Sequence, residues 1–147
     1  SRPLAFYAAG VFLFCASLFI LSCGNSNDPQ IAITNINITQ PLPGKSTSAG
    51  YFTLTNNTNS LIEITQITSP DFKSIQIHES VLDEGIAKMQ RIDSLQIKAK
   101  SELKLENGGK HLMLIDKKNS SEIISLYFYE KEKLLLDLKI NLTLRSK

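Results

Sequence analysis

The chain has 147 residues, 42% of them hydrophobic, which is enough for one domain with an adequate core and too few for two. Sixteen basic residues stand against 14 acidic ones without a basic stripe or an acidic run, so nucleic acid is not an expected partner. Both cysteines, Cys15 and Cys23, lie near the start. The body of the chain therefore forms neither a disulfide nor a cysteine-based catalytic or metal site.

Residues 1–22 are predicted to be a lipoprotein signal peptide. Arg2 precedes a stretch, residues 4–21, that contains no charged residue, as is typical of an export signal. Ile20-Leu21-Ser22-Cys23 matches the bacterial lipoprotein processing pattern, which predicts lipid attachment at Cys23. An uncleaved spanning helix is the alternative. Either reading anchors the protein to a bacterial membrane and places its body on the periplasmic side. The chain begins at Ser1 without an initiator Met.

Residues 23–30 are polar and turn-forming, and we expect a short tether there. From residue 31 to 147 the chain alternates with period two and is rich in Ile, Thr and Leu, which predicts one all-β domain. Its many short strands favour an antiparallel two-sheet sandwich, with a small barrel as the alternative. The predicted strands are 31–39, 50–56, 61–67, 73–80, 86–92, 101–106, 111–116, 122–130 and 134–144.

Histidine and methionine are confined to one part of this domain. The whole sequence holds two of each, and they are His78, Met89, His111 and Met113. Each of them alone would be assigned a structural role, since a lone Met on a strand is usually a core residue and a lone His is usually a surface or hydrogen-bonded core residue. Together, thioether and imidazole groups form a soft ligand set that suits Cu(I), whereas Ca²⁺ or Mg²⁺ prefers carboxylates. The four residues are therefore predicted to bind one Cu(I) ion.

The spacing of the four residues suits a shared site. On a strand, His111 and Met113 project from one face while Leu112 and Leu114 take the other. By the same alternation His78 shares a face with Gln76, opposite Ile75 and Ile77. His78 and Met89 flank the turn at 83–85, so we expect them nearly opposite each other in a hairpin. The two pairs are then expected to converge at one rim of the sandwich.

The pattern resembles the signature of the periplasmic copper chaperones of the PCu(A)C type. That signature is His, ten residues, Met, twenty-one residues, then His-x-Met, and His78, Met89, His111 and Met113 reproduce it without a gap. Residues 49–56, 77–80 and 108–114 also resemble the family's early strand and its two ligand segments. The resemblance covers roughly residues 31–144.

This resemblance implies a cupredoxin-like Greek-key sandwich that holds Cu(I) at an exposed edge. It also implies delivery of copper to a respiratory haem–copper oxidase subunit, often beside a Sco-type thiol protein. The chain has no His/Met-rich tail, so a second, Cu(II)-binding site is not expected. Catalysis is not expected either, since no nucleophile motif or His-rich cluster remains. Two alternatives stay open: a copper-buffering or resistance lipoprotein, and a structural lipoprotein with incidental His and Met.

Overall fold

A computed structural model describes residues 28–144, and this part of the chain is built from β-strands without a helix. The strands are β1 (Ile31–Ile38), β2 (Ser48–Asn56), β3 (Ile62–Ile64), β4 (Gln66–Thr68), β5 (Phe72–Asp83), β6 (Ile86–Ile92), β7 (Leu95–Ile97), β8 (Glu102–Leu105), β9 (Lys110–Lys117), β10 (Ile123–Glu130) and β11 (Lys133–Asn141). All pairs of these strands are antiparallel. The predicted all-β antiparallel fold is confirmed.

Several sequence predictions fall outside the described residues. They are the signal peptide at 1–22, the lipidation site Cys23 and most of the tether at 23–30. Within residues 28–144, no helix is long and apolar enough to cross a membrane.

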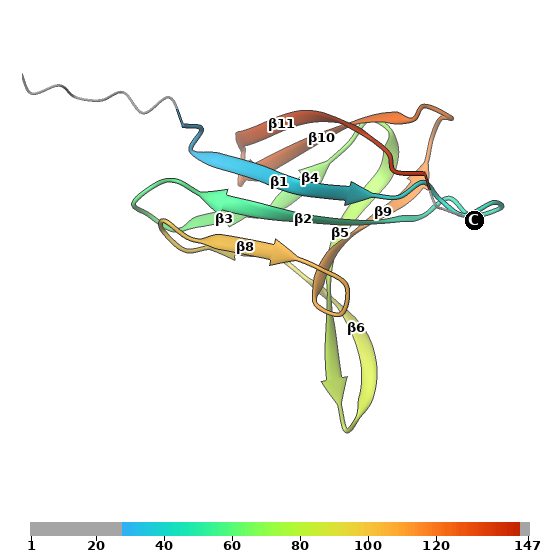
Figure 1. The fold of residues 1–147 in the computed structure, drawn as a ribbon, viewed down its shortest axis with the longest axis horizontal. Helices are drawn as coiled ribbons and strands as arrows, with labels where there is room; N and C mark the ends of the chain where they lie inside the picture. The colour runs from blue at the N-terminus through green and yellow to red at the C-terminus, as the bar shows by residue number, and fades with distance from the viewer. Residues whose placement is uncertain (1–27, 145–147) are drawn as a thin grey trace, which may run out of the picture.

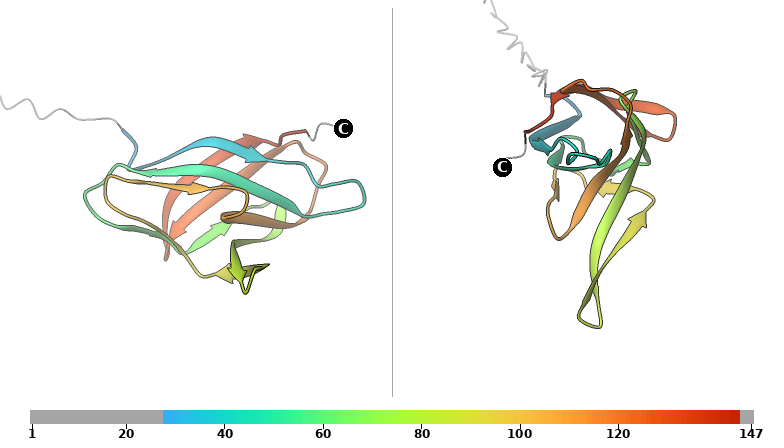
Figure 2. Two further views of the ribbon diagram at one scale, coloured as in Figure 1. Left: turned by 60° about the horizontal axis from the view of Figure 1, so that its bottom comes forward. Right: turned by 90° about the vertical axis from the view of Figure 1, so that its right-hand side faces the viewer.

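The strands form two layers, one large sheet and two smaller ones (Figures 1 and 2). The large sheet has the order β1-β2-β9-β5-β6, and β8 continues along the same edge of β2 that β9 pairs with. The second layer combines the sheet β11-β10-β4 with the pair β3-β7. The Thr65 N–H, between β3 and β4, donates to Tyr129 O at 2.9 Å and joins these two sheets.

Alternating apolar residues hold the layers together. Phe52 on β2 and Phe128 on β10 meet edge to face, with ring centroids 5.7 Å apart, a favourable arrangement for aromatic rings. Ile77, Leu112 and Leu114 are buried in the same core, and Ile75 packs against it. The face opposite to the four candidate ligands thus supplies core, as the alternation predicts.

Three short strands, β3, β4 and β7, differ from the prediction. The single strand expected at 61–67 is divided at Thr65 into β3 and β4, which pair with different strands. The strand β7 was not predicted, because three residues carry too little pattern to detect. Its outer residues, Leu95 and Ile97, are buried while Gln96 is exposed, so the alternation is real but short.

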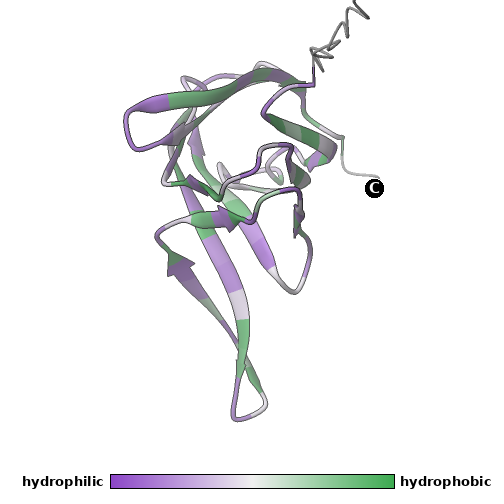
Figure 3. Ribbon diagram, turned by 90° about the vertical axis from the view of Figure 1, so that its left-hand side faces the viewer, coloured by the Kyte–Doolittle hydropathy of each residue, from purple (hydrophilic) through white to green (hydrophobic). Residues whose placement is uncertain are grey.

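The β5–β6 hairpin projects beyond the sandwich (Figures 1 and 2). Its two-residue turn, Glu84-Gly85, has φ values of 50° and 78°, as a type I′ turn requires. Near this turn Leu82 is 79% exposed and Ile86 is 63% exposed, and Figure 3 shows hydrophobic bands close to the tip. The hairpin is therefore an arm that the core does not cover.

Candidate metal centre

The four candidate ligands lie on one face of three neighbouring strands, β9, β5 and β6. His78 on β5 is directly opposite His111 on β9. Met113 is opposite Gln76, and Met89 on β6 is opposite Ser80. Directly opposed residues share a face of an antiparallel sheet, and so do alternate residues on one strand. The strand register therefore brings both predicted pairs to the same face, which points away from the core.

The expected position of Met89 needs a correction. Met89 does not lie opposite His78, because Arg91 occupies that place. The hairpin turns tightly at Glu84-Gly85, so its axis is displaced from the centre of the segment between His78 and Met89. A shift of two residues preserves the face, and Met89 becomes a diagonal neighbour of His78, about 7–8 Å away between Cα atoms. A flexible thioether side chain spans such a gap.

The two imidazole rings are spaced as a shared ion requires. Their centroids are 5.7 Å apart and the ring planes cross at 69°. A bond of about 2.0 Å between an imidazole nitrogen and a metal ion puts each centroid about 3 Å from the ion, so two rings that share it have centroids about 5 Å apart at a tetrahedral angle and about 6 Å apart when they lie on opposite sides. The observed centroid distance of 5.7 Å lies between these two values.

Exposure rises across the site from β9 to β6. His111 is 5% exposed, His78 and Met113 are half-buried, and Met89 is 63% exposed. The Tyr51 ring lies 6.2 Å from the His111 ring, between centroids, and covers that end. The site is thus closed at His111 and open to solvent at Met89.

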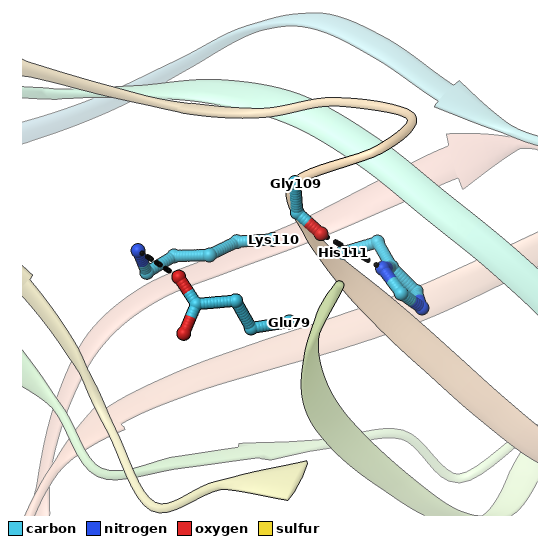
Figure 4. A network of polar contacts seen from close by, with 4 residues as sticks. All are labelled: Glu79, Gly109, Lys110 and His111. Atoms are coloured by element: carbon cyan, nitrogen blue, oxygen red, sulfur yellow. Dashed lines mark hydrogen bonds and ion pairs between the residues drawn. The ribbon is translucent and has the colours of Figure 1, made fainter. Parts of the chain in front are cut away.

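The backbone of the β8–β9 turn orients His111. Figure 4 shows the His111 ring beside the Gly109 carbonyl, which accepts a hydrogen bond from His111 Nδ1 at 3.3 Å. The same carbonyl accepts the Ser80 N–H at 3.1 Å, which ties the turn to β5. Because a carbonyl oxygen only accepts, Nδ1 carries the proton and Nε2 carries the free lone pair.

His78 has a different arrangement. Its Nε2 lies 2.9 Å from Gln76 Oε1, and its Nδ1 is buried without a hydrogen-bond partner. Buried polar atoms are nearly always paired, so an unpaired ring nitrogen needs an explanation. A bound metal ion at Nδ1 supplies one, and the residues present therefore fit a metal.

Burial and two nearby groups favour the neutral form of the His78 ring. Burial lowers the pKa of His78 below its usual value of 6.5, and the nearby His111 and Arg91 lower it further. Both effects disfavour the imidazolium form. His78 is therefore neutral at pH 7, as a ligand must be.

Among residues 28–144, no carboxylate forms a three-membered metal-binding group with His78 and His111. Glu79 lies next to His78 but on the other face of β5, where it accepts a hydrogen bond from Lys110 Nζ at 3.0 Å (Figure 4). Within residues 28–144, no group of three or more His, Cys, Asp or Glu residues is arranged to hold a metal ion. The donors that the strand register places on this face are two imidazoles and two thioethers, a set that suits a soft metal ion.

Two residues of the site were not among the predicted ligands. Gln76 was assigned to the face of His78 by alternation, but its hydrogen bond to the ring is visible only in the structure. Tyr51 could not be placed from the sequence, because its position beside His111 depends on the pairing of β2 with β9.

Comparison with known proteins gives both a family and a fold. Residues 31–122 match the family model LpqE-like, described as "Putative lipoprotein LpqE-like". A protein of Rickettsia prowazekii, "Uncharacterized protein RP573", is 32% identical over 88 residues, which are 57% of this chain. This chain spans about half of that relative's length, 49%.

Solved structures with a similar fold include PCuAC domains. The copper-bound PCuAC domain of PmoF2 has a TM-score of 0.62 at 18% identity, covering 80% of this chain and 94% of its own. Apo-DR1885 of Deinococcus radiodurans has a TM-score of 0.56 at 19% identity, covering 100% of this chain and 93% of its own. The resemblance to the PCu(A)C type is thereby confirmed at the level of the fold.

Proposed function

The chain belongs to the LpqE-like family and has the fold of PCuAC domains, and on that premise we propose that it is an extracytoplasmic Cu(I) carrier. His78, Met89, His111 and Met113 are the proposed ligands of one ion per chain. The observation that carries the proposal is the register of β9, β5 and β6, which gathers all the His and Met residues of the sequence on one face. The copper-bound state of the PmoF2 domain supports the choice of metal.

The architecture suits transfer better than permanent storage. Neutral imidazoles and thioethers hold Cu(I) without strong anionic bonds, so few such bonds must break when the ion leaves. Met89, the most exposed ligand, leaves one side of the ion open to an incoming ligand of a partner. We propose that the recipient is the copper-accepting subunit of a respiratory haem–copper oxidase, and that a Sco-type thiol protein acts in the same assembly pathway. A lipid on Cys23 would hold the carrier at the periplasmic side of the membrane.

Metal binding is tested by titrating the purified body, residues 24–147, with Cu(I) under anaerobic reducing conditions. We expect one ion per chain, with sulfur and nitrogen neighbours in X-ray absorption spectra. The double variant His78→Ala/Met89→Ala should lose this binding, whereas Lys104→Ala, an exposed change on β8, should keep it. Oxygen and nitrogen neighbours alone, or a stoichiometric preference for Zn²⁺, would contradict the proposal.

Delivery is tested separately from binding. The Cu(I)-loaded protein is mixed with the metal-free copper-binding domain of the oxidase subunit from the same organism, and the two are separated and assayed for copper. Transfer to the acceptor supports delivery. Retention of the copper by the carrier under these conditions would contradict delivery while leaving the binding proposal intact.

A further inference from the structure

The geometry points to Gln76 as a positioning residue that fixes the tautomer of His78, so that Cu(I) binds this histidine through Nδ1 and His111 through Nε2. The inference rests on the proposed function for the role of copper, and on the apoprotein alone for the tautomer. It concerns which nitrogen of each imidazole ring coordinates the ion, because naming His78 and His111 as ligands does not specify the nitrogen.

The first step is the direction of one hydrogen bond. Gln76 Oε1 lies 2.9 Å from His78 Nε2. An amide oxygen only accepts hydrogen bonds, so Nε2 is the donor and holds the ring proton. In a neutral imidazole the other nitrogen, Nδ1, then has the free lone pair.

The second step is the surroundings of that lone pair. His78 Nδ1 is buried and has no hydrogen-bond partner, an uncommon state for a buried ring nitrogen. If Nδ1 carried the proton instead, a buried N–H would have no acceptor and Gln76 would lose its donor. The Nε2–H tautomer is therefore the one that the fold favours, and it leaves Nδ1 free for a soft cation.

The third step is the contrast with His111. That ring donates from Nδ1 to the Gly109 carbonyl at 3.3 Å, which is the opposite tautomer. Metal-binding histidines usually donate their second N–H to an oxygen in this manner. The two rings are thus supported from different sides, His78 by a side chain of its own strand and His111 by the backbone of a turn.

Alternation along β5 explains why Gln76 is suited to this role. Gln76 and His78 project from the same face of the strand, two residues apart. Across β9 its opposite residue is Met113, so the amide stands between a ligand on its own strand and a ligand on the next. A change at Gln76 removes the acceptor without touching a proposed ligand atom.

The experiment uses ¹⁵N NMR of the imidazole nitrogens in residues 24–147, first without metal. The wild-type apoprotein should show His78 with its proton on Nε2 and His111 with its proton on Nδ1. In the Gln76→Leu variant, His78 should show a mixture of both neutral tautomers. The Gln76→Glu variant retains an oxygen acceptor, so His78 should keep its proton on Nε2. Gln96→Leu on β7 is the matched control, because Gln96 is exposed and lies outside the large sheet.

The second measurement adds Cu(I), which has a filled d shell and leaves the NMR signals observable. Binding should move the Nδ1 signal of His78 and the Nε2 signal of His111. In competition with a colorimetric Cu(I) chelator, Gln76→Leu should lower affinity by roughly 10–100-fold, the usual loss for a residue that supports a metal ligand. Gln76→Glu should restore most of it.

The outcomes separate this inference from the proposed function. If wild-type protein binds Cu(I) but His78 carries its proton on Nδ1, the inference is overturned and the function stands. The same holds if Gln76→Leu alters the tautomer and leaves the affinity unchanged. If no variant, including wild type, binds Cu(I), the proposed function fails, and the role of Gln76 toward copper fails with it.

Discussion

His78 and His111 lie directly opposite each other on β5 and β9, with their ring centroids 5.7 Å apart. Ile77 and Leu112, their chain neighbours, are buried on the other face. The core therefore fixes the backbone beneath both rings. The histidines form the rigid half of the proposed site.

Cu(I) affinity should depend on pH through these rings. The pKa of His78 lies below 6.5 because of burial and of the nearby His111 and Arg91. We expect affinity to be nearly constant between about pH 8 and pH 6.5 and to fall at lower pH, because each imidazole must be neutral to bind. Chelator competition at each pH measures the effect. A constant affinity down to pH 4.5 would contradict imidazole coordination.

The unfolding free energy of the apoprotein should also depend on pH through His78. Unfolded His78 has its ordinary pKa of 6.5, whereas the folded value is lower, so below pH 6.5 the unfolded chain binds more protons. The stabilisation from neutral His78 is complete above that pH and is lost as the pH falls toward the folded value. Urea unfolding of wild type and His78→Asn between pH 7.5 and 5 should show a shallower pH dependence in the variant. Equal slopes would contradict the lowered pKa.

The two methionines should respond differently to replacement. Met113→Leu roughly conserves volume and should cost less than about 1.5 kcal/mol in unfolding free energy. Met89→Leu, at a 63% exposed position, should change it by less than about 0.5 kcal/mol. Both should weaken Cu(I) binding by at least about 100-fold, more than the loss of a supporting residue. If Met113→Leu collapsed the fold while copper binding survived, Met113 would be core and not a ligand.

The metal-free protein should already be folded. Phe52, Phe128 and Leu114 build the core without any ligand atom. Copper should then stabilise by linkage alone, about 2.7 kcal/mol when free Cu(I) is 100 times Kd. Circular dichroism and thermal melting with and without Cu(I) test this. The double variant His78→Ala/Met89→Ala should have a melting temperature close to that of the wild-type apoprotein, and copper should raise it little. If the apoprotein were unstructured, the metal would have a structural role and this prediction would be wrong.

Asp71 offers a test of stability away from the metal. Burial raises the pKa of Asp71, but hydrogen bonds from Asn119, the Ser125 N–H and Ser69, together with the charge of Lys117, leave it below 3.8. Asp71 Oδ1 accepts from Asn119 at 2.9 Å and Oδ2 accepts from the Ser125 N–H at 2.8 Å. The carboxylate thereby joins the turn before β5 to the loop between β9 and β10.

Asp71→Asn should therefore destabilise the protein by about 1–2 kcal/mol at pH 7. The contribution of a carboxylate with a lowered pKa is present above 3.8 and is lost as the pH falls through the folded value, so the difference between wild type and variant should be smaller at pH 3 than at pH 7. Urea unfolding at both pH values measures this, with exposed Asp137→Asn as control. Copper affinity should be unchanged, and a loss of it would show that Asp71 acts on the site.

The sequence predicted the fold class correctly, but it did not predict how the candidate ligands are arranged on the strands. Period-two alternation located most strands, and it also predicted that Leu112 and Leu114 face the core. It could not show that the segment at 61–67 divides at Thr65, because a change of pairing partner leaves no mark on alternation.

The register of the β5–β6 hairpin shows the same limit. The turn residues were identified, yet the exact pair in the turn decides every opposite pair along the arm. With positive φ at Glu84 and Gly85, Met89 falls opposite Ser80. The pairing of β5 with β9, which brings His78 to His111, joins segments far apart in the chain and had no local signal.

The projecting hairpin divides the proposed site into two regions whose backbones differ in local stability. His111 and Met113 lie on β9 inside the large sheet, whereas Met89 lies on β6, an edge strand whose one partner among residues 28–144 is β5. Strands with few buried contacts open locally at a small fraction of the global unfolding free energy. Excursions of β6 would then detach the thioether of Met89 while both imidazoles stay in place. Dissociation of copper would proceed one ligand at a time, at a rate governed by fraying of one hairpin and not by unfolding of the sandwich.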